Sequence, residues 1–363
     1  GQTETSTGGT NQNVNPLPVP TPSPTPTPSP TPSPNINYYA FIAEEESGVL
    51  YCPVKENNGT ITSCSVESVP SAPNLWRPTG LSFTTVNGSL LLYVVDSSDN
   101  NQVWKCTVNN DGSFNSCSAA YDYTSTRGIG SYYQISFAWV NGVHYSYMAD
   151  SSTWINKCTV ENDGTLDNCT QYDLAISTFG ALQAYGVTVE SVGNSQYAYI
   201  TDIHTLGDSC HLFKCSITND GGIQDDCVAT SNGSGEWCPR TTTFSTYNNV
   251  QYAYVSEIPQ NGDSGNIYQC TLNNQDGTFN SCLTTPTSPP NWFPYMTAFI
   301  SDNTPFIYSI SRQTNNTGNN DVYSCSVNLT TGLIVPATCN VQQSNSSVNN
   351  AADAIVIQGF ASN

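Results

Sequence analysis

The sequence carries very little positive charge. Its 363 residues include 8 lysines and arginines against 28 aspartates and glutamates, which gives a net charge of -20. Nucleic acid and anionic lipid surfaces are excluded as main partners, because their phosphates would repel such a chain. Three of the basic residues, Lys105, Lys157 and Lys214, recur at one position of a repeat described below, so they are expected to spread around the fold without forming a patch.

Histidine is rare and long apolar runs are absent. The three histidines, His144, His204 and His211, stand in no Ser/His/Asp or His-x-Glu pattern, so no catalytic or metal-binding role is predicted for them. No apolar run reaches about 18 residues, so no membrane span is expected. The start of the sequence lacks the apolar core of a signal peptide and is expected to be that of a processed chain. No cofactor is predicted.

Residues 1–36 are predicted to be an extended tail. Proline occupies every second position from Pro16 to Pro34, and the preceding residues are polar and rich in glycine. Alternating X-Pro favours extended or polyproline II backbone, and about 20 such residues reach roughly 60 Å. The interleaved hydroxyls resemble O-glycosylated stalk sequence. These hydroxyl positions are Thr21, Ser23, Thr25, Thr27, Ser29, Thr31 and Ser33.

From residue 37 to residue 363 the chain repeats itself six times. Each repeat contains a strand-like segment that alternates apolar residues and, in five of the six, ends in a carboxylate: 39–44, 91–96, 145–150, 197–202, 252–257 and 306–311. A second strand-like segment follows with a cysteine near its centre, and these cysteines recur at intervals of 52 to 57 residues. Period-2 alternation and Asn-Gly turns predict four strands in each repeat.

Six four-stranded repeats predict an all-β, six-bladed β-propeller. The first repeat lacks its first strand, and residues 351–360 are an apolar alternating segment without a partner. Pairing this C-terminal strand in blade one would close the ring and remove an open sheet edge. A linear solenoid is the alternative, but it would need capping repeats at its ends.

The cysteines provide a test of this interpretation. Fourteen cysteines, an even number, predict disulfides and an oxidising compartment. Within each repeat two cysteines stand 11 to 14 residues apart, with a turn residue at or beside the midpoint. A two-residue Asp-Gly turn would place them directly opposite each other on the last two strands. The predicted pairs are Cys52/Cys64, Cys106/Cys117, Cys158/Cys169, Cys215/Cys227, Cys270/Cys282 and Cys325/Cys339, with Cys210/Cys238 as a seventh.

Three kinds of candidate site remain. One position at a strand end carries a carboxylate in five repeats: Glu44, Asp96, Asp150, Asp202 and Glu257. These carboxylates are weak candidates for a calcium site or for acid/base chemistry. Their alternative role is to accept hydrogen bonds from the backbone of the following loop. Ser311 takes the sixth position. The segment 203–213 is the largest break in the repeat. Seven N-glycosylation sequons occur, at Asn58, Asn87, Asn168, Asn232, Asn315, Asn328 and Asn345.

The alternating strands, the V-x-K-C-T-V segments and the Asn-Asp-Gly turns resemble the YVTN-type repeats of secreted bacterial propellers, relatives of lactonase-like propeller proteins. The resemblance covers about residues 37–363 and implies the propeller fold. No catalytic motif of that group can be placed on this sequence residue by residue. The paired cysteines depart from most of its members and favour a structural, extracellular protein over an enzyme.

The tail suggests a function. With proline at every second position, one edge of an extended segment has no N–H donors, while Leu17 and Val19 keep theirs on the other edge. Such a segment can add to an exposed sheet edge without templating a further strand, with Val14, Leu17 and Val19 as apolar anchors. We therefore expect an extracellular or cell-surface protein, a head-to-tail filament subunit or scaffold that binds copies of itself. The alternatives are a secreted adhesin that binds glycan or protein through one propeller face, and a lactonase-like hydrolase.

Overall fold

The computed structural model divides into two units, residues 1–34 and 35–363, and the second is the propeller. The residues described are 36–44, 48–67, 76–97, 102–122, 132–150, 153–174, 183–202, 210–230, 238–257, 265–285, 294–300, 305–311, 321–343 and 352–361. The residues of the predicted tail, including Val14, Leu17, Val19 and the hydroxyls of residues 21–33, lie outside them. So do His204 and the sequons at Asn232, Asn315 and Asn345.

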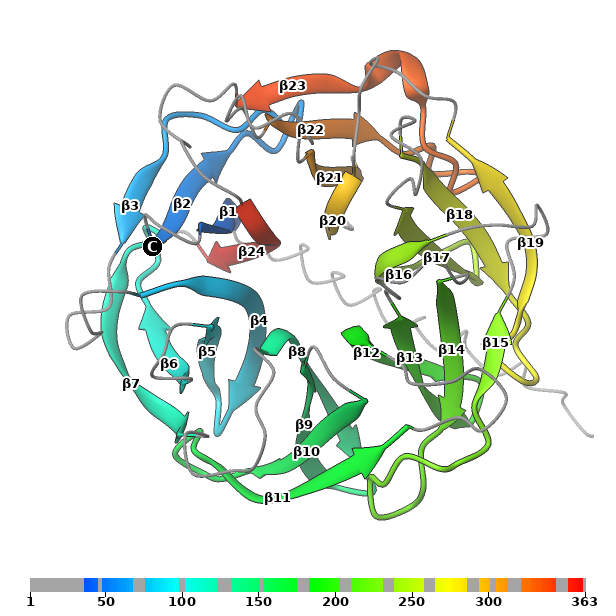
Figure 1. Cartoon of the computed structure of the whole chain (residues 1–363). Coiled ribbons are helices and arrows are strands. Elements are labelled where there is room, and N and C mark those ends of the chain that lie inside the picture. Colours follow the sequence, from blue (N-terminus) through cyan, green and yellow to red (C-terminus); the bar gives the residue numbers. More distant parts are fainter. Residues whose placement is uncertain are drawn as a thin grey trace, which may run out of the picture. The chain divides into compact units, whose positions relative to one another are not determined.

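The described residues of the second unit form six four-stranded antiparallel sheets around a common axis (Figure 1). The inner strands are β24 (Ala352–Ala361), β4 (Pro78–Val86), β8 (Tyr132–Val140), β12 (Ala184–Val192), β16 (Pro239–Tyr247) and β20 (Pro294–Ile300). The second strands are β1 (Ile36–Glu44), β5 (Ser89–Asp96), β9 (Val143–Asp150), β13 (Ser195–Asp202), β17 (Val250–Glu257) and β21 (Phe306–Ser311).

The two remaining strands of each sheet lie farther from the axis (Figure 1). The third strands are β2 (Gly48–Val54), β6 (Gln102–Val108), β10 (Trp154–Val160), β14 (His211–Ser216), β18 (Ile267–Leu272) and β22 (Asp321–Ser326). The outer strands are β3 (Ser65–Glu67), β7 (Phe114–Asp122), β11 (Leu166–Asp173), β15 (Val228–Thr230), β19 (Phe279–Thr284) and β23 (Asn340–Gln343). A short 3-10 helix, η1 (Pro336–Thr338), precedes β23.

Ring closure is confirmed. The C-terminal strand β24 pairs antiparallel with β1, with Ile36 opposite Ala361, and completes blade 1 with β2 and β3. Blades 2 to 6 then follow in sequence order as β4–β7, β8–β11, β12–β15, β16–β19 and β20–β23. The predicted all-β, six-bladed propeller is therefore the observed fold, and the described part of the chain holds no helix suited to cross a membrane.

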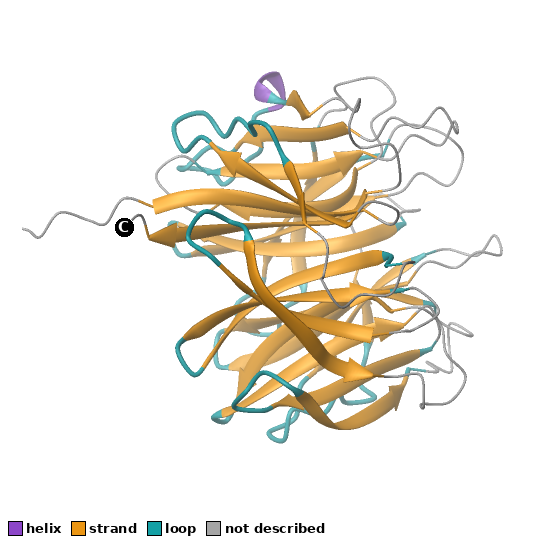
Figure 2. Ribbon diagram, turned by 90° about the vertical axis from the view of Figure 1, so that its left-hand side faces the viewer, coloured by secondary structure: helices purple, strands orange, loops and turns teal. Residues whose placement is uncertain are grey.

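One face of the ring carries the turns that join inner to second strands and third to outer strands (Figure 2). We call it the hairpin face. The Asn-Gly turns of blades 2 and 3 agree with the sequence prediction: Asn87 and Gly88 have φ angles of 48° and 77°, and Asn141 and Gly142 have 48° and 81°, as a two-residue turn with two left-handed residues requires. Because β1 begins and β24 ends at this face, the propeller unit starts and finishes there.

The prediction of two-residue turns between the third and outer strands is wrong. In the turn of blade 2 only Gly112 has a positive φ, 83°, and its N–H donates to Asn109 O over 2.9 Å. Ser113 N–H donates to a carboxylate oxygen of Asp111 over 3.0 Å. The turn is longer because the aspartate side chain bonds the backbone locally, and a single left-handed glycine then returns the chain to the sheet.

Seven disulfides join all 14 cysteines in the pairs expected from the sequence. Six of them close the hairpin between the third and outer strands of one blade, where Cα atoms stand 4.0 to 4.2 Å apart. The seventh is different in kind. Cys210 precedes β14 in blade 4 and Cys238 precedes β16 in blade 5, so this disulfide joins two neighbouring blades.

The predicted position of the second cysteine, on the outer strand and directly opposite its partner, is correct in only two blades. Cys117 faces Cys106 and Cys282 faces Cys270. The prediction is wrong for Cys64, Cys169, Cys227 and Cys339. Three of these, Cys64, Cys227 and Cys339, stand just before β3, β15 and β23 and are not part of those strands. The second cysteine is half-buried in all six hairpin pairs, whereas the first is buried.

In blades 4 and 6 the outer strand begins only after the second cysteine, because side chains replace backbone hydrogen bonds between the third and outer strands there. Ser216 N–H donates to a carboxylate oxygen of Asp226 over 2.9 Å, beside Cys227. Ser326 N–H donates to Thr338 Oγ1 over 2.9 Å, beside Cys339. Because a side-chain oxygen takes the bond that a backbone carbonyl would accept in a regular ladder, the outer strand begins only after the cysteine.

A β-bulge in blade 3 and a short outer strand in blade 1 explain why Cys169 and Cys64 do not lie directly opposite their partners. In blade 3 Lys157 faces Thr170 and Thr159 faces Asp167, so two residues, Asn168 and Cys169, oppose Cys158 alone. In blade 1 an isolated bridge joins Val54 to Ile61, and pairing resumes only at Ser65, after Cys64. The cysteine spacing therefore predicts which residues pair, but not the strand register around them.

The core lies between the sheets, and one tyrosine position on the second strands dominates it. The five largest fully buried side chains among the described residues are tyrosines at this position: Tyr93, Tyr147, Tyr199, Tyr254 and Tyr308. Phe41 takes the same position in blade 1. Each tyrosine hydroxyl donates to a glycine carbonyl in the outer turn of the next blade. The acceptors are Gly164, Gly221, Gly277, Gly332 and Gly59, at 2.7 to 2.8 Å. We call this contact the blade latch.

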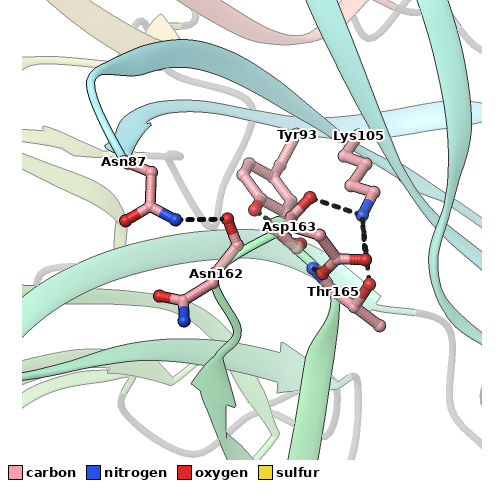
Figure 3. A network of polar contacts seen from close by, with 7 residues as sticks. Asn87, Tyr93, Lys105, Asn162, Asp163 and Thr165 are labelled. Atoms are coloured by element: carbon pink, nitrogen blue, oxygen red, sulfur yellow. Dashed lines mark hydrogen bonds and ion pairs between the residues drawn. The ribbon is translucent and has the colours of Figure 1, made fainter.

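A residue before the first cysteine of the blade reinforces the latch. Lys105 Nζ donates to Asp163 O over 2.6 Å and to Thr165 Oγ1 over 3.0 Å, and it lies 3.4 Å from an Asp163 carboxylate oxygen (Figure 3). Lys157 and Lys214 reach Asp220 O and Asp276 O in the same way. The lysines are therefore distributed around the ring, as expected, and serve blade-to-blade packing.

Candidate functional site

The carboxylates at the ends of the second strands are buried, and two of them accept hydrogen bonds from backbone N–H groups. Glu44, Asp96, Asp150, Asp202 and Glu257 are each at most 7% exposed. Asp96 accepts a hydrogen bond from Arg77 N–H over 3.0 Å, and Asp202 accepts one from Gln183 N–H over 2.7 Å. Both donors precede the inner strand of the same blade. Asp96 and Asp202 thus hold the entry of the inner strand of their own blade. The residues that follow them, 98–101 and 203–209, lie outside the described part of the chain, so the expected bonds to the following loop stay a prediction.

Glu257 follows the same rule. Burial raises the pKa of its carboxyl, while hydrogen bonds that include one from the Cys238 backbone oppose that rise. Asn266 Nδ2 also donates to Glu257 over 2.9 Å. Cys238 immediately precedes β16, so the donor again stands at the entry of an inner strand. Among the described residues no three His, Cys, Asp or Glu side chains come together as the ligands of one metal ion would.

A cavity of about 690 Å³ lies along the axis between the inner strands. Its described lining consists of hydroxyl, amide and apolar side chains and includes no charged group. Gln134 contributes Oε1, which accepts from Val187 N–H over 3.0 Å and so bridges blades 3 and 4. The lining residues are Leu81–Phe83, Gln134–Ser136, Thr188, Thr241–Thr246 and Ala354–Gln358. Among the described residues this lining offers hydroxyl groups but no carboxylate, imidazole or thiol.

The hairpin face has polar contacts that sequence reasoning missed. Glu190, near the end of β12, accepts from Gln251 Nε2 of blade 5 over 2.5 Å. Burial raises the pKa of Glu190 to about 7, and the bond from Gln251 opposes that rise. Thr84 of blade 2 and His144 of blade 3 meet in the equivalent way, with Oγ1 and Nε2 3.0 Å apart. Burial lowers the pKa of His144.

Two surface features also stand out. A second cavity, of about 660 Å³, lies in blade 1 beside the start of β1 and is lined by Ile36–Tyr39 and Pro53–Asn57. In addition, four outer strands present an exposed aliphatic side chain one or two residues after the second cysteine. These residues are Val66 (55% exposed), Val228 (46%), Leu283 (56%) and Val341 (45%), and we call them the apolar arc.

The remaining sequence candidates are distributed over the surface. The sequons at Asn58, Asn87, Asn168 and Asn328 are all exposed. Asn87 uses its Nδ2, the atom that would carry a glycan, to donate to Asn162 O of the next blade over 2.7 Å (Figure 3). His211 lies in β14 with its ring 5.4 Å from that of Phe213. Residues 203–209 of the irregular blade-4 segment lie outside the described residues.

No known protein family matches the chain, and no curated protein sequence matches it. Solved structures match it in fold. A protein of unknown function from Bacteroides caccae aligns over 90% of this chain and 99% of its own, with a TM-score of 0.50 and 10% identity. A thermostable family-43 glycoside hydrolase aligns over 82% and 100%, with a TM-score of 0.50 and 11% identity. The GH43 BlXynB protein from Bacillus licheniformis aligns over 75% and 57%, with a TM-score of 0.50 and 11% identity. At these identities the likeness is one of fold.

Proposed function

We propose that this protein is an extracellular structural protein, a subunit of a surface filament or scaffold whose N-terminal tail docks on the propeller of a neighbouring copy. The apolar arc is the observation that carries the proposal. Exposed aliphatic residues on an unpaired sheet edge promote association, and natural proteins usually remove them or cover them. Here they lie on the outer strands of four consecutive blades, 4, 5, 6 and 1, where the ring offers no further strand to cover them.

The sequence of the tail is suited to such an edge. Its proline alternation leaves N–H donors on one side only, so it can complete an outer strand and then stop further strand addition. Val14, Leu17 and Val19 supply apolar side chains to meet the arc. A tail that docks on a second copy makes a heterologous contact that does not close, and repetition of that contact builds a filament.

The disulfides and the site geometry favour a structural role over catalysis. Seven disulfides suggest an oxidising, secreted environment. The resemblance to YVTN-type secreted propellers supports that location, and we infer the cell surface as the place of assembly. We do not extend the resemblance to lactonase-like hydrolysis, because the strand-end carboxylates with known partners bond backbone N–H groups and the axial cavity has an uncharged described lining.

Deletion of residues 1–34, which leaves β1 complete, tests the proposal. Full-length protein is expected to form regular head-to-tail polymers by negative-stain microscopy and light scattering, and the truncated protein is expected to be monomeric. Substitution of Leu283 by Lys, on the arc, is expected to shorten the polymers; Leu329→Lys, a change of a similarly exposed leucine in an outer turn, is the control. Truncated protein that still forms the same polymers would refute the proposal.

A further inference from the structure

Trp139 is unusual among the described tryptophans. It lies in β8 at the hairpin face and is 58% exposed, whereas Trp76 and Trp104 are 9% and 5% exposed and Trp154 is half-buried. A tryptophan side chain offers a large apolar ring with one N–H donor, and burying it normally stabilises a fold. An exposed tryptophan on the rigid end of a core strand is therefore a candidate contact for a ligand.

The ring of Trp139 is held in place by its neighbours. His144 lies opposite it on β9, and the two rings are parallel, with centroids 4.4 Å apart and planes inclined by 6°. His144 is 5% exposed and is itself fixed by Thr84 of blade 2, 3.0 Å from Nε2. Because one face of the indole lies on the imidazole, its exposed area belongs to the opposite face and the ring edges. A ring fixed in advance loses little conformational entropy when a ligand stacks on it.

Polar side chains continue from the tryptophan along the hairpin face. Gln196 Nε2 of blade 4 donates to Trp139 O over 3.0 Å and to Ser191 Oγ over 3.2 Å. Gln251 Nε2 of blade 5 donates to Ser191 O over 3.0 Å and also bonds Glu190. Amide, hydroxyl and carboxyl groups thus adjoin an aromatic platform, and they extend over three neighbouring blades.

We propose that Trp139 and this polar row form a binding site for a neutral carbohydrate chain. A pyranose ring offers an apolar C–H face to an indole and hydroxyls to amides and carboxylates at its edge, which matches the groups placed here. The net charge of -20 disfavours anionic polysaccharides. The site does not depend on assembly through the tail, so it adds a binding function to the structural one.

Titration of the full-length protein with cellohexaose, maltohexaose and chitohexaose, followed by calorimetry and tryptophan fluorescence, tests the site. We expect saturable binding of at least one of them, a loss of tenfold or more in affinity with Trp139→Ala, and a smaller loss with Trp139→Phe. His144→Ala should weaken binding by removing the support of the ring. Leu329→Ala, an exposed apolar truncation in blade 6, should leave it unchanged, and thermal unfolding checks that each variant folds.

Three results would overturn the proposal. The first is the absence of saturable binding of all three oligosaccharides at millimolar concentration. The second is oligosaccharide binding that Trp139→Ala leaves unchanged. The third is a Trp139-dependent binding of the apolar dye ANS without any oligosaccharide binding, which would assign the platform to a protein contact.

Discussion

The hydroxyl of Tyr93 in blade 2 donates a hydrogen bond of 2.7 Å to the carbonyl oxygen of Gly164 in blade 3. The same glycine has a φ of +84°, and a Cβ atom built on it would lie 2.9 Å from that hydroxyl and 2.6 Å from Leu91 Cδ1. The turn between the third and outer strands of a blade is thus the part that the preceding blade contacts through its buried tyrosine. This relationship explains why tyrosine, lysine and Asp-Gly recur together in the sequence.

Loss of the latch hydroxyl should destabilise the ring. In Tyr93→Phe the Gly164 carbonyl loses a buried donor, which we expect to cost about 1–2 kcal/mol in the free energy of unfolding. Tyr197→Phe is the control, since Tyr197 contacts the next turn through ring carbons beside Gly277. Urea unfolding followed by circular dichroism measures both variants. Equal losses in the two would show that the hydroxyl bond contributes nothing specific.

Two glycine substitutions separate backbone strain from latch packing. Gly164 and Gly88 have φ angles of +84° and +77°, so alanine should cost each turn about 1–2 kcal/mol through its left-handed conformation. Only at Gly164 does the added methyl meet other atoms, whereas nothing lies within 4 Å of the equivalent position at Gly88. We expect Gly164→Ala to lower the midpoint of thermal unfolding clearly more than Gly88→Ala. Equal shifts would contradict the latch.

The repeat, the ring closure and the disulfide pairs could be predicted from the sequence because they follow from local patterns. A cysteine pair centred on a turn specifies its own hairpin, as Cys106 and Cys117 show by pairing directly opposite each other. The register at Cys169 could not be predicted, because a bulge leaves no mark on the spacing of the cysteines. The contacts between blades could not be predicted either, since strand periodicity does not say which residue of the neighbouring blade a side chain contacts. In the sequence, Tyr93 is indistinguishable from the other apolar residues of its strand, because its hydrogen-bond partner, Gly164, lies in the next blade.

The candidate site was less predictable for a related reason. The position of Asp202 at a strand end could be read from the sequence, but its partner, the N–H of Gln183, lies 19 residues away at the entry of another strand. Glu190 and Trp139 carried no motif at all. Their surroundings come from strands of blades 2 to 5 that converge at the hairpin face, and only the closed ring brings these strands together.

Asp202 should contribute to the free energy of unfolding and should not bind calcium. Asp202→Ala removes the acceptor of the Gln183 N–H and should cost about 1–3 kcal/mol, whereas Asp202→Asn keeps an acceptor oxygen and should recover part of this. Thermal unfolding with added calcium chloride or with EDTA should give the same midpoint for the wild type. A calcium-dependent rise in that midpoint that Asp202→Ala abolishes would show that the carboxylate binds metal.

The disulfide between blades should differ from those within blades. The chain-entropy relation gives about 3.5 kcal/mol for the 28-residue separation of Cys210 and Cys238, and about 3 kcal/mol for the 12 residues between Cys270 and Cys282. Replacing both cysteines of a pair by alanine should therefore cost slightly more for the first. Hydrogen exchange should then quicken in β14 and β16 for the first pair, but in β18 and β19 for the second. Identical exchange patterns for the two variants would contradict the assignment of Cys210–Cys238 as a disulfide between blades.

Glu190 should make stability depend on pH near neutrality. Burial raises the pKa of its carboxyl in the folded chain to about 7, above the ordinary value of 4.5. The folded state therefore favours the protonated form, so this stabilisation is complete below about pH 4.5 and is lost as the pH rises through about 7. Glu190→Gln keeps a neutral group beside Gln251 at every pH. At pH 8 it should be more stable than the wild type by on the order of 2 kcal/mol, with little difference at pH 4.5. Urea unfolding across this range measures the difference, with exposed Glu161→Gln as the control. Parallel curves for Glu190→Gln and the wild type would mean that the carboxyl ionises in the folded protein as freely as in the unfolded chain.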